Sequence, residues 1–314
     1  MKTIQFSKSD NPLDIRFDNI FKAVFTKNSS ASRQALSDLV SAFIKRTVTV
    51  KTITANEPPA DDVRNRHIRF DISCFAKNGE LINIEMSFNP ESHEPVRLEY
   101  HCARLFIWQD IKGIKKDYSD LKETYQIAIL SKRLFFRDKA LVHTFRYHDP
   151  VNHVSLGGKT RIITVELPKA RQALNKPVGK LDAQEAWAVF FQYLTDRGKR
   201  EKINEILKRE AGIAMAGEEL IRISRNDRER ARLLSEWKYA LDIQCRQVSA
   251  ERRGIKKGLR EGRKEGREEG RVEGRTEGRI DEKFDIARKL KARGRSLKEI
   301  AEDTGLSIKH IEKL

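Results

Sequence analysis

Alternating apolar and polar residues between Ile68 and Phe88 predict the central element of the fold, a β-hairpin. Apolar side chains occupy every second position on both sides of Lys77-Asn78-Gly79, and polar side chains fill most positions between them. A period of two places the apolar side chains of each strand on one face, and Asn-Gly is a frequent turn sequence between paired strands. The pattern therefore predicts two antiparallel strands with one apolar face.

The same alternation predicts the register of the hairpin. A two-residue turn would mix the apolar and polar faces, whereas a three-residue loop with a left-handed Gly79 sets Ile72 opposite Ile84. Because a slip of one residue moves every side chain to the other face, the pattern selects the three-residue loop. Asp71 then lies opposite Glu85. Two adjacent carboxylates need compensation, which a divalent cation, a neighbouring Lys or Arg, or a retained proton can supply.

The segments on either side of the hairpin alternate between helical and strand patterns. Apolar residues three or four positions apart predict helices over residues 17–25, 32–45, 96–111 and 181–194. Runs rich in β-branched or apolar residues predict strands over residues 47–54, 125–130, 141–147 and 161–167. We therefore expect residues 1–195 to form one α/β domain built on a mixed sheet.

Two further parts of the chain are expected to follow this domain. Residues 196–250 have helical apolar spacing and predict a helical extension. Residues 251–281 predict a linker in which glycine recurs every four residues from Gly254 to Gly278, with glutamate before most glycines and arginine after them. Each glycine costs a helix about 1 kcal/mol relative to alanine, and the repeat offers no apolar core. It therefore predicts a flexible or marginal helix that becomes regular against a partner chain in a homo-oligomer.

Residues 282–314 regain helical periodicity and predict a small helix-turn-helix-like module. Helices are expected over residues 286–293 and 297–303 and from residue 307 to Leu314, with Ser296 capping the second and Glu299 completing its capping box. This spacing suits DNA binding, and the alternative is a helical hairpin used for self-association.

The composition favours a polyanionic partner. Lysine and arginine number 63 against 46 aspartates and glutamates, a formal net charge of +17, which favours nucleic acid ahead of an anionic membrane surface. Cys74, Cys102 and Cys245 lie far apart in the chain and predict reduced thiols rather than a zinc ribbon or a disulfide framework. We find no apolar signal segment and no run as long as a membrane span, and we expect a cytoplasmic protein without membrane association.

Asp71 and Glu85 on adjacent strands, backed by the helix at residues 17–25, are what a metal-dependent phosphodiesterase needs. Mg²⁺ prefers carboxylate oxygens and keeps several waters, and it activates one water while neutralising charge on the phosphate. The usual third group is a lysine or glutamine two residues after the glutamate, where this chain has Ser87. The alternative is that both carboxylates are solvated or salt-bridged groups without a metal.

Several motifs occur in a defined order along nearly the whole chain. They are D-x-x-F-K-x-V-F at residues 18–25, the hairpin with Asp71 and Glu85-Met86-Ser87, R-L-E-Y at 97–100, D-Y-S-D-L at 117–121, V-E-L-P-K at 165–169, the glycine-arginine repeat, and I-A-E-D-T-G-L-S at 300–307. Together they resemble the recombination-promoting nuclease / putative transposase family of PD-(D/E)XK nucleases. The resemblance implies a restriction-endonuclease-like α/β fold, with helices flanking a mixed sheet and a C-terminal helical extension. It also implies Mg²⁺-dependent DNA cleavage and a role in recombination or transposition.

The resemblance also implies which residues form the site. Asp71 and Glu85 match the metal-binding carboxylates, and Asp18 matches an acidic position on the first helix. Ser87 departs from the family, which usually has glutamine or lysine there, because serine can bind a water but supplies neither charge nor reach. Lys22 can take that role if its helix lies over the hairpin. The remaining candidates, which would support the site or contact DNA phosphate, are Arg97 and Tyr100.

We therefore expect a Mg²⁺-dependent DNA endonuclease that promotes recombination or transposition. One alternative is a catalytically weakened nuclease fold that acts as a DNA-binding or assembly module, and Ser87 favours it. Another is a structural oligomer built through the glycine repeat.

Overall fold

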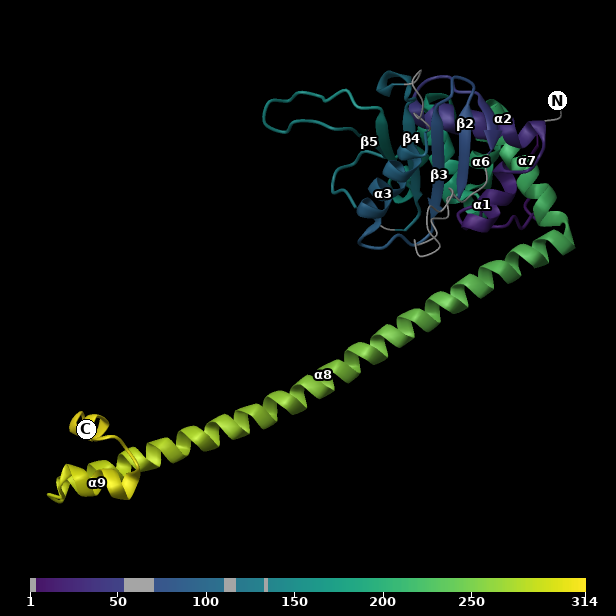
Figure 1. Cartoon of the computed structure of the whole chain (residues 1–314). Coiled ribbons are helices and arrows are strands. Elements are labelled where there is room, and N and C mark those ends of the chain that lie inside the picture. Colours follow the sequence, from purple (N-terminus) through teal and green to yellow (C-terminus); the bar gives the residue numbers. More distant parts are fainter. Residues whose placement is uncertain (1–3, 54–70, 110–116, 133–134) are drawn as a thin grey trace. The chain divides into compact units, whose positions relative to one another are not determined.

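The computed structural model describes residues 4–53, 71–109, 117–132 and 135–314. The chain divides into two compact units, residues 1–238 and residues 239–314. The first unit contains a sheet with helices on both of its faces, and the second contains most of one long helix and two short ones (Figure 1).

The first unit is built on a six-stranded sheet with the order β1-β2-β3-β4-β6-β5. Strands β3, β4 and β6 are parallel to one another, and the other neighbouring strands are antiparallel. The predicted mixed sheet flanked by helices is therefore confirmed. The strands are β1 (Val50–Ile53), β2 (Ile72–Ala76), β3 (Leu81–Ser87), β4 (Thr124–Leu130), β5 (Val142–Phe145) and β6 (Thr160–Glu166).

The hairpin of β2 and β3 has the predicted register. Ile72 pairs with Ile84, and Gly79 has a φ of +87°, the left-handed conformation that the three-residue loop requires. The part of the predicted first strand before Asp71 lies outside the described residues. The polar face of β3 is as buried as its apolar face, because helix α3 (Glu94–Ile107) covers it. The alternation therefore indicates which side of the sheet is apolar, but neither side is exposed to solvent.

The apolar face of the sheet packs against the remaining helices of the first unit. Fully buried aromatic side chains fill this core, with Trp187 at its centre against Phe25 and Phe191. Burial of each such side chain stabilises the fold by about 1.5–3 kcal/mol. The helices around this core are α1 (Asp18–Phe25), α2 (Ser30–Ile44), α5 (Ala183–Tyr193), α6 (Arg200–Arg209) and α7 (Ala211–Arg225), and a short helix, α4 (Arg171–Leu174), precedes α5.

The packing of α6 and α7 moves the boundary between the units away from the predicted residue 195. Ile206 of α6 and Leu220 of α7 are fully buried in the same core as the sheet. Their apolar faces need cover, and α7 lies against α2. The helical extension therefore begins as part of the first unit, and the boundary falls inside helix α8 (Asp227–Ala292).

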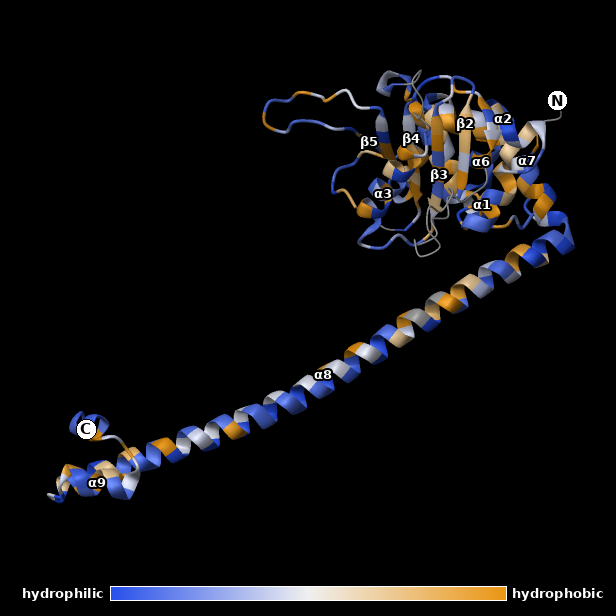
Figure 2. Ribbon diagram, viewed as in Figure 1, coloured by the Kyte–Doolittle hydropathy of each residue, from blue (hydrophilic) through white to orange (hydrophobic). Residues whose placement is uncertain are grey.

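Helix α8 continues through the glycine repeat, which is regular helix in this single chain. This corrects the prediction of a flexible or marginal helix that becomes regular only against a partner chain. Arginine, lysine and glutamate are strong helix formers, and at least two of them separate each glycine from the next, which offsets part of the glycine cost. Polar residues cover most of α8, whereas apolar residues concentrate around the sheet (Figure 2).

The tail folds as its capping residues predict. Helix α9 (Leu297–Thr304) begins after Ser296, whose side chain and that of Glu299 form the predicted capping box, and helix α10 (Ile308–Glu312) follows. Ala287, Ile300 and Ile311 form a small core of their own. Among the helices of the described residues, none combines the length and the apolarity needed to cross a membrane.

Candidate active site

The two predicted carboxylates come together beside the carboxyl end of β3. Glu85 is the third residue from that end, and Asp71 directly precedes β2 on the neighbouring strand. Asp71 Oδ2 accepts a hydrogen bond of 3.0 Å from the backbone N–H of Met86, so this side chain is anchored to β3. The antiparallel register thus places both carboxylates at one edge of the sheet.

Helix α1 supplies the cation that faces Asp71. Lys22 Nζ lies 3.0 Å from Asp71 Oδ1 and 3.6 Å from Asp18 Oδ2, so the three side chains form one ion-paired group. Burial alone would lower the pKa of Lys22, but the charges of Asp71 and Asp18 and their hydrogen bonds with Lys22 together outweigh it, and the pKa of Lys22 is raised. Burial raises the pKa of Asp71, an effect that Lys22 opposes and the nearby Glu85 reinforces. Lys22 is therefore a fixed cation at this site.

Helix α3 supplies a second ion-paired group around Glu85. Arg97 Nη2 lies 2.9 Å from Glu85 Oε2 and 2.5 Å from Glu94 Oε1. His101 Nδ1 lies 2.5 Å from Glu85 Oε1 and is itself buried. Burial would raise the pKa of Glu85, but the hydrogen bond with His101 and the charge of Arg97 hold it below its usual value. Glu85 is therefore an ionised carboxylate under α3.

Two buried amides complete the layer between α3 and the sheet. Asn83 Nδ2 donates to Glu85 Oε1 at 3.0 Å and to Gln126 Oε1 at 2.8 Å. Asn83 and Gln126 pair across β3 and β4, and neither has any exposed surface. Because both residues belong to regular strands, this network holds the Glu85 carboxylate in a defined orientation.

The other candidates from the sequence lie in different environments. Ser87 is half-buried at the end of β3, and its carbonyl accepts a hydrogen bond from the N–H of Ser131. Tyr100 is 55% exposed, and its ring lies 6.5 Å from that of His101. The structure therefore brings Lys22, rather than Ser87, to Asp71, and it places Arg97, rather than Tyr100, against Glu85.

Sequence reasoning missed His101, Asn83 and Gln126. His101 follows Arg97 by four residues, so a helical reading of this segment places both on the same face. Asn83 precedes Glu85 by two residues, so an extended strand points both side chains the same way. These spacings were the available signals, but only the position of α3 shows that all of these groups converge.

The donor set suits a hard divalent cation. In the first ion-paired group, the carboxylates of Asp18 and Asp71 surround Lys22. In the second, the carboxylates of Glu85 and Glu94 surround Arg97. Each group therefore carries a formal excess of one negative charge. Glu85 Oε2 is buried and, apart from its ion pair with Arg97 Nη2, has no hydrogen-bond partner within the described residues. Within the described residues no three His, Cys, Asp or Glu side chains are grouped to hold a metal. Two carboxylates supplemented by waters and substrate phosphate are the usual Mg²⁺ arrangement, and Asp71 with Glu85 would provide it.

Comparison with known proteins identifies the first unit. Residues 15–249 match the family model described as PD-(D/E)XK nuclease family transposase. This range includes the whole sheet, both ion-paired groups and helices α1 to α7. No curated protein and no solved structure matches the chain.

Proposed function

This chain belongs to the PD-(D/E)XK nuclease family of transposases, and from that premise we propose that it is a Mg²⁺-dependent DNA endonuclease. Its proposed role is the cleavage of phosphodiester bonds during recombination or transposition. The observation that carries the proposal is the pair of inward-facing carboxylates, Asp71 and Glu85, each beside a fixed cation at one edge of the sheet.

Asp71 and Glu85 are the proposed metal ligands. Bound Mg²⁺ would supply an activated water and neutralise charge on the phosphate. The chain itself keeps Glu85 ionised, through His101 and Arg97, and holds its direction through Asn83. Asp18, at the exposed end of the α1 ion-paired group, assists by keeping Lys22 in place.

Lys22 takes over the role that Ser87 cannot fill. Its pKa is raised, so it does not act as a general base at neutral pH. A permanent cation beside Asp71 instead orients the attacking water and stabilises the negative charge that develops on the phosphate. In this proposal Arg97 supplies a second cation from α3, and Ser87 is a bystander.

A plasmid-nicking assay with Mg²⁺ tests the proposal, with Glu85→Gln as the principal variant. The matched control is Glu80→Gln, because Glu80 is also buried and ion-paired, with Arg46, but lies at the opposite end of the hairpin. We expect Glu85→Gln to abolish nicking and Glu80→Gln to retain it. Thermal melting adds a second readout, since Mg²⁺ should raise the Tm of the wild type and not that of Glu85→Gln. A wild type that neither nicks DNA nor responds to Mg²⁺ would refute the proposal.

The competing function is a weakened nuclease fold that binds DNA without cutting it. Ser87 favours this reading, because it occupies the position of the usual water-positioning residue. It predicts salt-sensitive DNA binding without nicking. A Ser87→Gln variant restores the usual water-positioning residue. It should gain nicking activity if the site lacks only that residue, and it should remain inactive if the fold is non-catalytic.

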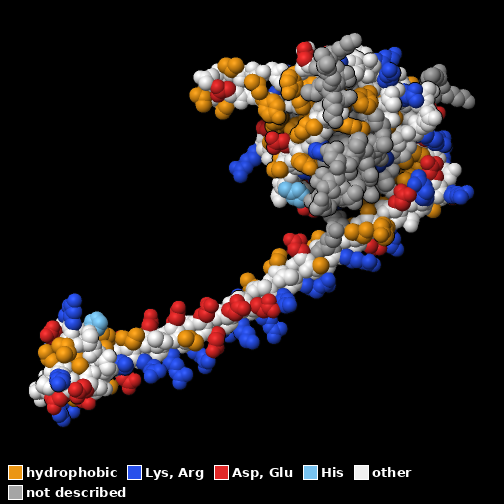
Figure 3. Space-filling model, viewed as in Figure 1, with side chains coloured by type: hydrophobic (Ala, Val, Ile, Leu, Met, Phe, Trp, Pro, Cys, Tyr) orange, Lys and Arg blue, Asp and Glu red, His pale blue; other side chains and the backbone are white. Residues whose placement is uncertain are grey.

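We further propose that the glycine repeat of α8 joins two copies of the chain in parallel. Successive residues of a helix are rotated by about 100° around its axis. The residue that follows each glycine and the residue that precedes it therefore lie on opposite sides of that glycine. From residue 261 onward these positions carry arginine and acidic residues, and Figure 3 shows the two charges on different sides of α8. Parallel helices set the arginine side of one against the acidic side of the other, whereas antiparallel helices oppose like charges.

A further inference from the structure

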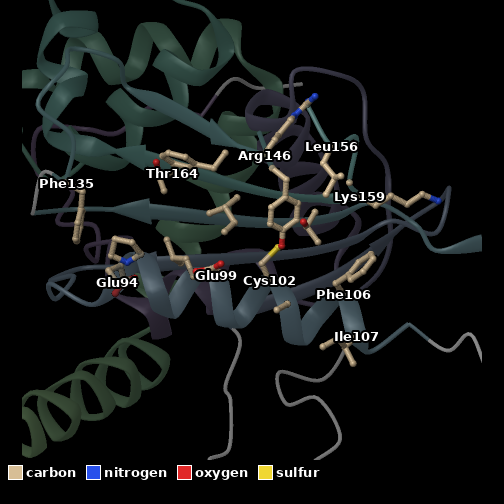
Figure 4. A pocket seen from close by; sticks show the side chains of 18 of the residues that line it. Glu94, Glu99, Cys102, Phe106, Ile107, Phe135, Arg146, Leu156, Lys159 and Thr164 are labelled. Carbon is tan, nitrogen blue, oxygen red and sulfur yellow. The ribbon is translucent and has the colours of Figure 1, made fainter. Parts of the chain in front are cut away.

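A cavity of about 520 Å³ opens between α3 and the strands β5 and β6. Figure 4 shows its lining, with Cys102 and Phe106 of α3 on one side and Thr164 of β6 on the other. Five aromatic side chains contribute to the wall: Phe106, Phe135, Phe136, Phe145 and Tyr147. Its volume lies within the range of about 300–1,000 Å³ that is typical of small-molecule sites. Phe145 and Tyr147 are 40% and 56% exposed, so aromatic faces remain available to a ligand.

A second cavity, of about 630 Å³, adjoins the first and is basic. Phe135 and Phe136 line both cavities. The cations of the second cavity are Arg137, Lys139, Lys169 and Arg171. Glu166 and Asp138 neutralise Lys169, whereas the other three cations are exposed and form no ion pair within the described residues. The cavity therefore presents three exposed cations without an ion-pair partner, and a net charge of +2 once Lys169 and its two carboxylates are counted, beside an aromatic wall.

The aromatic cavity shares a residue with the candidate active site, and the basic cavity lies two strands away from that site. Glu94 lines the aromatic cavity and pairs with Arg97, which pairs with Glu85. The basic cavity lies just beyond the carboxyl end of β6, and the candidate site lies near the carboxyl end of β3, with β4 between them. Two strand spacings amount to about 10 Å. That span corresponds to about three nucleotides at the 3.4 Å spacing of a strand in duplex DNA, and to fewer in an unstacked strand.

We propose that the two cavities together bind an unpaired nucleotide of the DNA strand, a few positions from the phosphodiester that is cut. The aromatic cavity takes the base and the basic cavity takes its phosphate. Stacking on aromatic side chains beside a basic groove is the physical basis of single-strand binding. The identification of the strand as DNA rests on the proposed nuclease function.

The charges around the cavities orient the nucleotide in one direction. The aromatic cavity is lined by equal numbers of carboxylates and cations, Glu94 and Glu99 with Arg146 and Lys159. Its carboxylates accept hydrogen bonds from base amino groups, whereas the excess of positive charge lies in the basic cavity. The phosphate is therefore directed toward Arg137, Lys139 and Arg171. A base can occupy the aromatic cavity only when it is unstacked, so the preferred substrates are single strands, frayed ends and branched DNA rather than intact duplex.

Binding of fluorescent oligonucleotides to the full chain in EDTA tests the proposal without cleavage. Tyr147→Ala removes an exposed ring from the aromatic cavity, and Tyr239→Ala is its control, an exposed tyrosine of α8. We expect Tyr147→Ala to weaken single-strand binding about 5- to 150-fold, the range measured for single stacking residues, and to change duplex binding by less than about twofold. The double variant Arg137→Ala/Arg171→Ala removes two proposed phosphate contacts. It should therefore lower the slope of the logarithm of the single-strand binding constant against the logarithm of salt concentration by about 1.4 in magnitude. Its control is Arg33→Ala/Lys51→Ala, two exposed cations of α2 and β1.

Two results would overturn the proposal. One is equal weakening of single-strand and duplex binding in Tyr147→Ala. The other is a change in oligomeric state without a change in DNA binding, which would make the aromatic cavity a protein interface. Failure of the nuclease function is separate, because the wild type would then not nick DNA while the binding results in EDTA stand unchanged.

Discussion

The substitution Lys22→Met tests whether Lys22 contributes to catalysis at the candidate active site. Lys22 Nζ lies 3.0 Å from Asp71 Oδ1, and an effective dielectric constant near 20 gives an attraction of about 5 kcal/mol at that separation. The desolvation of both groups offsets much of this attraction, since their side chains are only 26% and 16% exposed. We therefore expect Lys22→Met to lower the free energy of unfolding by about 1–3 kcal/mol.

The effect of Lys22→Met on activity should be much larger than its effect on stability. The substitution removes a preorganised cation from the place where charge develops on the phosphate, and loss of one such group typically lowers turnover by about 10²–10³-fold. The assay is single-turnover plasmid nicking with Mg²⁺, on protein shown to be folded at the assay temperature. Because the pKa of Lys22 is raised, the loss should be the same at about pH 6 and pH 9.

Lys27→Met is the matched control for that experiment. Lys27 Nζ lies 3.0 Å from Glu219 Oε1, and its side chain is 35% exposed, so its ion pair resembles that of Lys22 but lies away from the two carboxylates. We expect Lys27→Met to lose similar stability and to keep its nicking rate. Equal nicking in wild type and Lys22→Met, or equal loss in the two variants, would refute the assignment of Lys22. Recovery of nicking by Ser87→Lys in the Lys22→Met background would support it further.

Three further predictions concern Glu85, its partner and the repeat. His101→Ala leaves a buried carboxylate oxygen with fewer partners and should lower the free energy of unfolding by about 1–3 kcal/mol, measured by urea titration; an unchanged midpoint would contradict this. The folded-state pKa of Glu85 is lowered, so its contribution to stability is present above its unfolded pKa of about 4.3 and is lost as pH falls below it. Glu85→Gln should therefore flatten the acid side of the stability–pH curve, and a curve as steep as that of the wild type would contradict the lowered pKa. If two copies pair in parallel through the repeat, a short bismaleimide should join the exposed Cys245 of one copy to that of the other. Cys245→Ser and deletion of residues 254–280 should each abolish the cross-linked dimer. An antiparallel pair would also give no cross-linked dimer.

The sequence predicted the elements of the first unit because their patterns are local. The apolar period of α1, the largely apolar run of β4 and the aromatic stripe of α5 each correspond to an element found in the structure. Ile72 opposite Ile84 and the left-handed Gly79 followed from the alternation alone. The predicted ends were less accurate. Helix α3 ends at Ile107, and β1 is confined to Val50–Ile53, because tertiary packing rather than local pattern decides where an element stops.

In the C-terminal half, composition is a poor guide to the structure. Glycine content argued against a regular helix, yet α8 continues through the repeat. The apolar stripes of α6 and α7 gave no sign of which surface they cover, so the division at residue 195 missed their burial in the core of the first unit. The capping box of Ser296 and Glu299, by contrast, is formed within four residues and was correctly predicted.

The sequence by itself determined that Asp71 and Glu85 share one edge of a hairpin, because strand register depends only on alternation and turn length. Only the tertiary structure decided what surrounds them. Lys22 comes from a helix almost fifty residues before Asp71, and Arg97 and His101 come from a helix on the opposite face of the sheet from α1. A period-two pattern shows which way a side chain points but not what covers it. The two carboxylates, a buried Glu85 and a half-buried Asp71, were therefore predictable as a pair, and their two cations were not.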